Sequence, residues 1–286
     1  MTTSPVAIER VSEHRCFGGT ASFWRHASTA TSTQMSFGMF VPEAARAGQH
    51  RPVLTYLAGL TCNPEPFMTQ AGAFRAAAEA GIILVAPDTS PRGEGVPDTP
   101  DEWDFAQGAG FYINATQAPW AQHFQMESYI TGDLRAALEA NFPVDLARHG
   151  IFGHSMGGHG ALTLGLKYPD LYKSLSAFAP ISNPVDCPWG QKAFSRYLGG
   201  SAESWKAHDA SELLAQAGSG PKILVDQGLG DAFLTEQLKP EALERTAETS
   251  GRELTVRRHD GYDHGYYFIQ TFVDDHIRHH AETLGA

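Results

Sequence analysis

The segment IFGHSMGGHGAL, residues 151–162, constrains the fold of this 286-residue chain more than any other stretch. It places a Gly-x-Ser-x-Gly motif after an apolar run that predicts a strand and before a stretch with helical character. In such a turn the serine is lifted clear of the sheet, and the helix N-terminus behind it favours negative charge. A side chain at Gly153 or Gly157 would collide with neighbouring backbone in so tight a turn. The pattern favours Ser155 as a nucleophile over the alternative, a tight turn with an incidental serine.

Short apolar segments alternate with amphipathic ones along most of the chain. This alternation predicts an α/β fold with a mostly parallel twisted sheet and helices on both faces. The part before about Pro42 has instead the pattern of antiparallel strands, at TASFWRH and MSFGMFV, so we expect a mixed sheet. No linker or internal repeat is visible, which favours a single domain over residues 1–286. The expected strands are 52–59, 82–88, 174–180, 222–228 and 253–260, and the expected helices are 71–80, 126–142, 156–168, 240–250 and 266–284.

Composition excludes several classes of protein. Hydrophobic residues make up 42% of the chain, which is enough apolar mass for a sizeable core. The formal net charge of −11 gives an acidic surface that repels phosphate backbones, so we expect no nucleic-acid partner. No apolar run of about 18 residues predicts a membrane span, and MTTSPVAIER lacks the pattern of a secretory signal. The odd number of cysteines, Cys16, Cys62 and Cys187, then indicates free thiols in a reducing cytoplasm.

Two long stretches, residues 89–124 and 181–208, fit neither the period of a helix nor that of a strand. Structureless loops of this length are uncommon in compact domains and usually carry function. Both follow predicted strands, and ligands of open α/β sheets bind beyond the carboxyl ends of strands. We expect them to form the walls of one pocket, with ordinary surface loops as the alternative. Their aromatic residues argue against fully solvated loops: Trp103, Tyr112, Trp120 and Trp189.

The nucleophile needs a base, because a serine hydroxyl is a poor nucleophile until its proton is taken. In a fold with this motif, the acid and then the histidine follow the serine along the chain. His264 lies in the glycine-bounded loop GYDHGYYF, between the last strand and the last helix, where the base belongs. The alternative is a loop histidine that caps the helix. His154 and His159 lie inside the motif, too near in sequence to reach the hydroxyl from across the pocket.

Three further histidines form the segment HIRHH on the closing helix: His276, His279 and His280. Their spacing allows a metal site as one interpretation. No carboxylate or cysteine pattern joins them in the sequence, however, so we expect a solvated helix end.

The acid is expected in a loop after the penultimate strand, where KILVDQGLGDAFL offers two carboxylates. Asp226 lies within the strand run, whereas Asp231 follows two glycines and is the better candidate. Its carboxylate would hold the tautomer of His264 and stabilise the imidazolium. Asp260 and Asp263 flank His264 and are expected to be loop or capping residues.

Acyl transfer also needs hydrogen-bond donors for the oxyanion. One expected donor is the backbone N–H of Met156, the residue after the serine. The other is the N–H of Leu60, in the loop after the strand VLTYLAG. Each such donor contributes on the order of 100-fold to 1,000-fold in rate.

Many segments, in the same order along the chain, closely resemble S-formylglutathione hydrolases, the esterase D family. The resemblance runs from about Arg51 to His280, and two positions differ from the usual serine of the family, Ala58 and Gly265. The segments are LAGLTCN, APDTSPRG, WDFAQGAGFY, NFPVD, IFGHSMGGHGAL, SAFAPISNPVDCPWGQKAFSRYLG, DQGLGDAFL and GYDHGYYFIQTFVDDHIRHH.

The resemblance implies an α/β-hydrolase fold and hydrolysis of S-formylglutathione to glutathione and formate, the step that ends glutathione-dependent formaldehyde detoxification. It implies a cytoplasmic enzyme, commonly a homodimer, that needs no metal or other cofactor. It also implies that the catalytic residues are Ser155, Asp231 and His264, the set already reached from the motifs.

Two side chains near the expected site have alternative roles. Trp189 in CPWGQKAF is expected to line the acyl pocket, which can be narrow for a formyl group, and packing is the alternative. Cys62, close to the expected oxyanion donor, could modulate activity by oxidation, although a buried inert thiol is the favoured interpretation.

Three other functions compete with this one. A general carboxylesterase acting on short-chain oxygen esters would use the same three residues. An acyltransferase of the mycolyl-transferring kind shares the architecture but would normally be exported. A non-enzymatic binding protein is disfavoured because the serine, acid, histidine and oxyanion set is intact.

Overall fold

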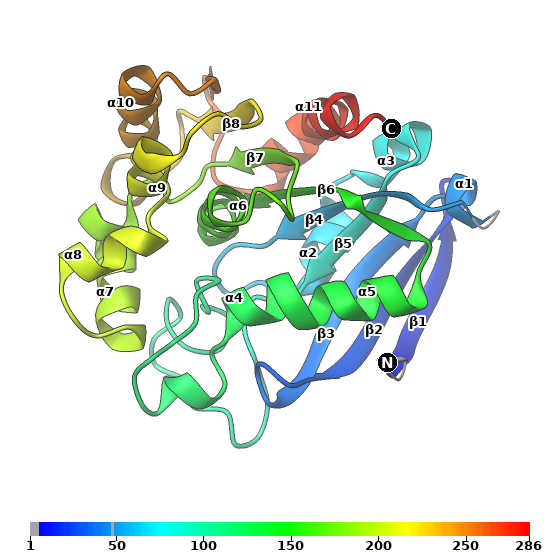
Figure 1. Cartoon of the computed structure of the whole chain (residues 1–286), viewed down its shortest axis with the longest axis horizontal. Coiled ribbons are helices and arrows are strands. Elements are labelled where there is room, and N and C mark those ends of the chain that lie inside the picture. Colours follow the sequence, from blue (N-terminus) through cyan, green and yellow to red (C-terminus); the bar gives the residue numbers. More distant parts are fainter. Residues whose placement is uncertain (1–5, 47–48) are drawn as a thin grey trace.

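The computed structural model describes residues 6–46 and 49–286 (Figure 1). These residues form a nine-stranded sheet in the order β1-β2-β3-β5-β4-β6-β7-β8-β9. The first three strands pair antiparallel with their neighbours, and the other six run parallel. The predicted mixed α/β sheet is therefore confirmed. The strands are β1 (Ile8–Cys16), β2 (Gly19–Ser28), β3 (Thr33–Val41), β4 (Arg51–Leu57), β5 (Ile83–Pro87), β6 (Val144–His154), β7 (Ser174–Phe178), β8 (Ile223–Gly228) and β9 (Leu254–His259).

The central parallel strands are buried on both faces, and this is why the sequence reveals them. Every residue of β5 (ILVAP) and of β7 (SLSAF) is buried, and such strands have apolar runs rather than alternation. The sequence did not reveal β1, because this edge strand (IERVSEHRC) is mostly polar and exposed. A bulge between Arg10 and Ser12 interrupts its pairing with β2, which blunts an edge that could otherwise pair with other chains.

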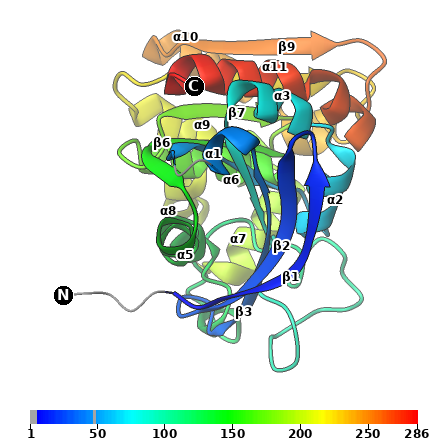
Figure 2. The same ribbon diagram turned by 90° about the vertical axis from the view of Figure 1, so that its right-hand side faces the viewer.

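Helices cover both faces of the sheet (Figures 1 and 2). On one face α11 packs against β6, β7 and α3, and on the other face α6 packs against β6 and β7 with α9 and α10 beyond it. Among the described helices, none has the length and apolar character needed to cross a membrane. The helices include α1 (Glu43–Arg46), which precedes β4 in the chain, α2 (Pro64–Gln70), α3 (Phe74–Ala80), α6 (Met156–Lys167), α9 (Ala210–Gln216), α10 (Pro240–Ser250) and α11 (Tyr266–Leu284).

The helix expected over residues 126–142 forms with a change of pitch in its first half. Asp133, at the end of the wider turn, accepts a hydrogen bond from Ser28 Oγ at 2.7 Å, which ties the helix to the end of β2. The three parts are α4 (Met126–Ser128), a π-helical turn (Tyr129–Asp133) and α5 (Leu134–Asn141).

The stretch 181–208 is not structureless, so that prediction was wrong. It contains α7 (Pro188–Tyr197) and the short α8 (Ala202–Trp205). Proline at the first position starts α7, and its buried face includes Trp189 and Phe194. The stretch 89–124 does lack long elements.

The segment HIRHH is not a solvated helix end, and this expectation was also wrong. His276 and His280 are fully buried, whereas His279 is partly exposed. The two rings can be buried because hydroxyl groups on β7 are hydrogen-bond partners for their nitrogens. Ser176 Oγ lies 2.8 Å from both His276 Nδ1 and His280 Nε2, and Ser174 Oγ lies 2.6 Å from His280 Nδ1. Within the described residues, no group of three or more His, Cys, Asp or Glu could hold a metal ion.

Asp226 ends this chain of hydrogen bonds and joins three elements. Its buried carboxylate accepts hydrogen bonds from Arg257 of β9 at 2.6 and 2.5 Å and lies 3.3 Å from His276 Nε2 of α11. Burial alone would raise the pKa of Asp226, but the hydrogen bonds of His276 and Arg257 outweigh it and hold the pKa well below its usual range. β8, β9 and α11 are thus held together beside the loops that carry Asp231 and His264.

Replacement of Asp226 by asparagine should lower the free energy of unfolding at neutral pH by about 2 kcal/mol, because Arg257 and His276 lose a charged hydrogen-bond partner. Asp275 still pairs with Arg257 at 2.7 Å, so the arginine keeps one carboxylate. Since the pKa of Asp226 is lower in the folded chain than in the unfolded one, this stabilisation is present above the unfolded value of about 4 and is lost as the pH falls. Urea denaturation of both proteins at several pH values tests this. The difference should narrow below about pH 4, and a difference that stays constant would contradict the assignment.

Candidate active site

Ser155 stands at a strained turn between β6 and α6. Its φ of 58° and ψ of −120° are rarely adopted by residues other than glycine. A Cβ on Gly157 would overlap the carbonyl oxygen of Leu57 at the end of β4, and a Cβ on Gly153 would overlap the carbonyl oxygen of Gly157. The expected collision of flanking side chains with backbone is therefore confirmed.

His264 and Asp231 form a short hydrogen bond, as the sequence predicts. The loop between β9 and α11 carries His264, and its Nδ1 donates to Asp231 Oδ2 at 2.6 Å. The other carboxylate oxygen of Asp231 accepts from the Phe233 N–H at 2.8 Å, and Gln227 Nε2 lies 3.3 Å from Oδ2. The Asp231 side chain is fully buried, and this environment fixes both the carboxylate and the tautomer of the imidazole.

Ser155 and His264 line the same cavity, with Asp231 behind the imidazole. Within the described residues, however, no hydrogen bond joins the Ser155 hydroxyl to His264. Catalytic hydrogen bonds are often long or poorly aligned before substrate binds, so the arrangement is compatible with general base catalysis.

The other carboxylates near this loop are engaged elsewhere. Asp226 pairs with Arg257, on the α11 side of the sheet. Asp263 Oδ1 accepts a hydrogen bond from the Gly265 N–H at 2.9 Å, which matches the loop role predicted for it. Asp231 is the carboxylate that the structure brings to His264.

The backbone N–H groups of the two expected oxyanion donors, Met156 and Leu60, lack a backbone partner among the described residues for different reasons. Met156 is the first residue of α6, where the N–H has no partner within the helix. Leu60 N–H donates to no backbone carbonyl in the described part of the chain, whereas its neighbour Thr61 donates to Gly108 at 2.9 Å and Cys62 donates to Gly59 at 3.3 Å. The loop is thus held on both sides of one unpaired donor.

The cavity at Ser155 has a volume of about 250 Å³ and an aromatic wall. Trp103 and Trp189, one from each long stretch, meet there edge to face with ring centroids 5.7 Å apart. The prediction that the two stretches form the walls of one pocket is confirmed. No Asp, Glu, Lys or Arg of the described residues lines this cavity.

Three aromatic lining residues were not predicted from the sequence. Phe233 and Tyr266 each lie two positions beyond a member of the hydrogen-bonded pair, Asp231 and His264, and this spacing was the available signal. His154 lines the same cavity, although its place in the motif had suggested only that it could not act as the base.

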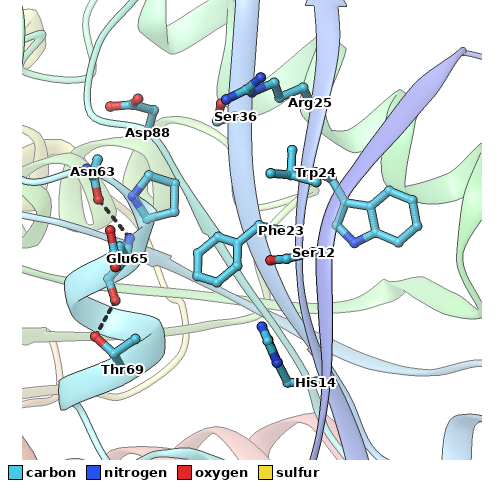
Figure 3. A pocket seen from close by; sticks show the side chains of 12 residues that line it. Ser12, His14, Phe23, Trp24, Arg25, Ser36, Asn63, Glu65, Thr69 and Asp88 are labelled. Atoms are coloured by element: carbon cyan, nitrogen blue, oxygen red, sulfur yellow. Dashed lines mark hydrogen bonds between the residues drawn. The ribbon is translucent and has the colours of Figure 1, made fainter.

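A larger hollow of about 500 Å³ lies between the N-terminal strands and α2 (Figure 3). Across it, His14 and Phe23 of the sheet face Asn63 and Glu65 of the helix start. Asn63 Oδ1 is already used there, since it accepts the Glu65 N–H at 2.8 Å and so caps α2. The described residues of this hollow form no hydrogen-bonded set of serine, histidine and carboxylate, so the smaller cavity at Ser155 is the candidate active site.

Cys62 lines the cavity at Ser155 and is half buried. Burial raises the pKa of its thiol, which reduces the thiolate that reacts with oxidants. This supports the inert interpretation. The carbonyl oxygen of Cys62 has a structural role, because it accepts hydrogen bonds from Thr89 Oγ1 at 2.5 Å and from Arg92 at 2.8 Å.

The chain is similar to known proteins over almost its whole length. It matches the "Esterase" family model over residues 28–279. It is 51% identical to an S-formylglutathione hydrolase from Paracoccus denitrificans, over 98% of this chain and 99% of the relative, and 48% identical to one from Mus musculus, over 98% and 100%. A solved structure of an S-formylglutathione hydrolase from Agrobacterium tumefaciens superposes with a TM-score of 0.94 at 44% identity, over 96% of this chain and 99% of that one. The chain therefore belongs to the esterase family and, within it, to the S-formylglutathione hydrolases, with the α/β-hydrolase fold expected from its sequence.

Proposed function

We propose that this chain hydrolyses the thioester S-formylglutathione to glutathione and formate, the reaction that completes glutathione-dependent formaldehyde detoxification. The observation that carries the proposal is the 2.6 Å hydrogen bond of His264 to Asp231 beside the strained Ser155. The names of the relatives, at about half identity over nearly full length, supply the substrate.

The proposed reaction proceeds through an acyl-enzyme. Ser155 Oγ attacks the formyl carbon while its proton passes to His264, and Asp231 stabilises the imidazolium. The oxyanion accepts hydrogen bonds from the N–H groups of Leu60 and Met156. The carbon–sulfur bond then breaks, the sulfur of glutathione takes the proton from His264, and the formyl group remains on Ser155. Water gives a proton to His264 and attacks this ester, and formate leaves as the serine regains its proton.

Trp189 is proposed to limit the acyl side of the cavity. The residue is 7% exposed, and its ring packs against that of Phe233 with centroids 4.7 Å apart. Its backbone N–H donates to Gln237 Oε1 at 3.0 Å, which anchors the start of α7. A wall held in this way suits a formyl group better than a longer acyl chain.

The apolar lining also favours a second candidate function, a general short-chain carboxylesterase. Neutral oxygen esters need no charged partner, and the described lining contains no Asp, Glu, Lys or Arg. Both functions use the same three catalytic residues, so the distinction rests on relative rates.

We further propose that the protein works in the cytoplasm as a homodimer without a metal or other cofactor. The three cysteines are all free thiols, which suits a reducing compartment. The dimer and the absence of a cofactor rest on the resemblance to the family.

Replacement of Ser155 by alanine should lower kcat on S-formylglutathione by about 10⁴-fold or more, because the nucleophile is lost. The exposed Ser195 on α7 provides the matched control, and Ser195→Ala should leave kcat unchanged.

The unaltered enzyme should also favour S-formylglutathione over S-lactoylglutathione by at least about tenfold in kcat/KM, since both share the thiol carrier and differ in the acyl group. Full activity of the Ser155→Ala variant would refute the nucleophile, and a preference for nitrophenyl butyrate over the thioester would favour the carboxylesterase.

Replacement of Trp189 by alanine should raise the ratio of kcat/KM for nitrophenyl butyrate over nitrophenyl acetate by about tenfold, because the larger pocket accepts the longer acyl chain. Trp205→Ala removes a partly buried indole outside the cavity and serves as the control. An unchanged ratio in Trp189→Ala would show that this residue only packs.

A further inference from the structure

The imidazole of His264 lies against two other rings. The ring of His154 is 4.4 Å away between centroids, with the planes inclined by 47°. The ring of Phe233 is 5.0 Å away and nearly perpendicular, at 77°. Together with the hydrogen bond from Nδ1 to Asp231, these contacts restrict rotation of the imidazole about its side-chain torsions.

His154 is hydrogen-bonded to the backbone of His264, but part of its ring has no polar partner in the described part of the chain. It is the last residue of β6, only 7% exposed, and its Nε2 has no hydrogen-bond partner among the described residues. An unpaired buried nitrogen costs free energy, whereas an apolar ring of similar size would not. The contacts of the ring with its neighbours are therefore expected to offset the cost of the unpaired nitrogen.

The ring of His154 also belongs to the part of the backbone that carries the nucleophile. His154 directly precedes the strained Ser155, so the backbone fixes the Cβ atoms of the two side chains relative to one another. A Cβ on Gly59 would come within 3.3 Å of His154 Nδ1 and 3.2 Å of Ser155 Cβ. The loop with the Leu60 N–H therefore packs on the same two residues.

The charge state of His154 suits contact with a base. Burial, and after it the nearby charge of His264, hold the pKa of His154 well below its usual range. A neutral ring does not oppose the positive charge that His264 gains on accepting a proton, whereas a cation at this distance would.

We propose that His154 is a positioning residue whose ring holds the His264 imidazole in the orientation needed to take the proton of Ser155. This inference rests on the base role proposed for His264. It differs from the simpler interpretation of His154 as a buried filler of the core, which would affect stability alone. A misplacement of about 1 Å at a reacting group can cost about 100-fold in rate, so the two interpretations differ measurably.

The test compares His154→Ala with His154→Phe on nitrophenyl acetate, a substrate whose turnover does not depend on recognition of glutathione. His154→Ala should lower kcat by about 10- to 100-fold and change KM by less than about threefold, because the chemical step and not binding is impaired. His154→Phe, which keeps a planar neutral ring, should recover kcat to within about fivefold of the unaltered enzyme. If His154→Ala does not fold, His154→Leu replaces it, since leucine fills the volume without a planar ring and should show the same loss.

The control is His26→Ala, which removes another buried histidine, one that is hydrogen-bonded to Tyr129 on a different part of the sheet. It should lower stability and leave kcat within about twofold. A folded His154→Ala or His154→Leu variant with kcat within about twofold of the unaltered enzyme would overturn the proposal. Equal losses in the phenylalanine and alanine variants would also overturn it, because ring support would then not be the cause.

Ser155→Ala, measured alongside, separates this proposal from the proposed function. Turnover that depends on Ser155 but not on His154 would overturn the positioning role and leave the nucleophile intact. Turnover that does not depend on Ser155 would overturn both. A preference for other substrates over S-formylglutathione would leave the expected His154 effect unchanged.

Discussion

The close approach of α6 to the end of β4 determines the geometry of the whole site. Gly157 passes so near the carbonyl oxygen of Leu57 that no side chain fits between them. The turn that makes this approach leaves Ser155 with positive φ, and the surrounding packed structure holds the residue in that strained conformation. The result is a hydroxyl held at the N-terminus of a buried helix, where developing negative charge is favoured.

Buried polar contacts bring the remaining chemistry to the same edge of the sheet. Asp226 joins β8, β9 and α11, and the loops that leave these elements carry Asp231 and His264. Rings then define the immediate surroundings of the imidazole, with His154 on the nucleophile turn and Phe233 beyond the acid. The contacts of Asp226, which stabilise the fold, thus lie next to the contacts that orient His264.

Local patterns were sufficient where the physical cause is local. Gly153, the apolar runs of the central strands and the bounds of α11 follow from short-range sterics and periodicity. Gly157 was recognised through the motif, although its steric cause is the distant Leu57 of β4. The order of serine, acid and histidine was enough to choose Asp231 and His264. The burial of His276 was not predictable, because it depends on hydroxyl groups that β7 brings from a distant part of the chain. The contact of His154 with the imidazole was missed for the same reason, since the end of β6 and the loop between β9 and α11 meet there.

The most direct test of the account is to look for the acyl-enzyme. The enzyme is mixed with S-formylglutathione, stopped in acid during turnover, digested and examined by peptide mass spectrometry. We expect the mass of one formyl group on the peptide that contains Ser155, and none in a sample stopped after the substrate is exhausted. Turnover at full rate with no formylated peptide, or with the formyl group on another residue such as Cys62, would contradict the central claim.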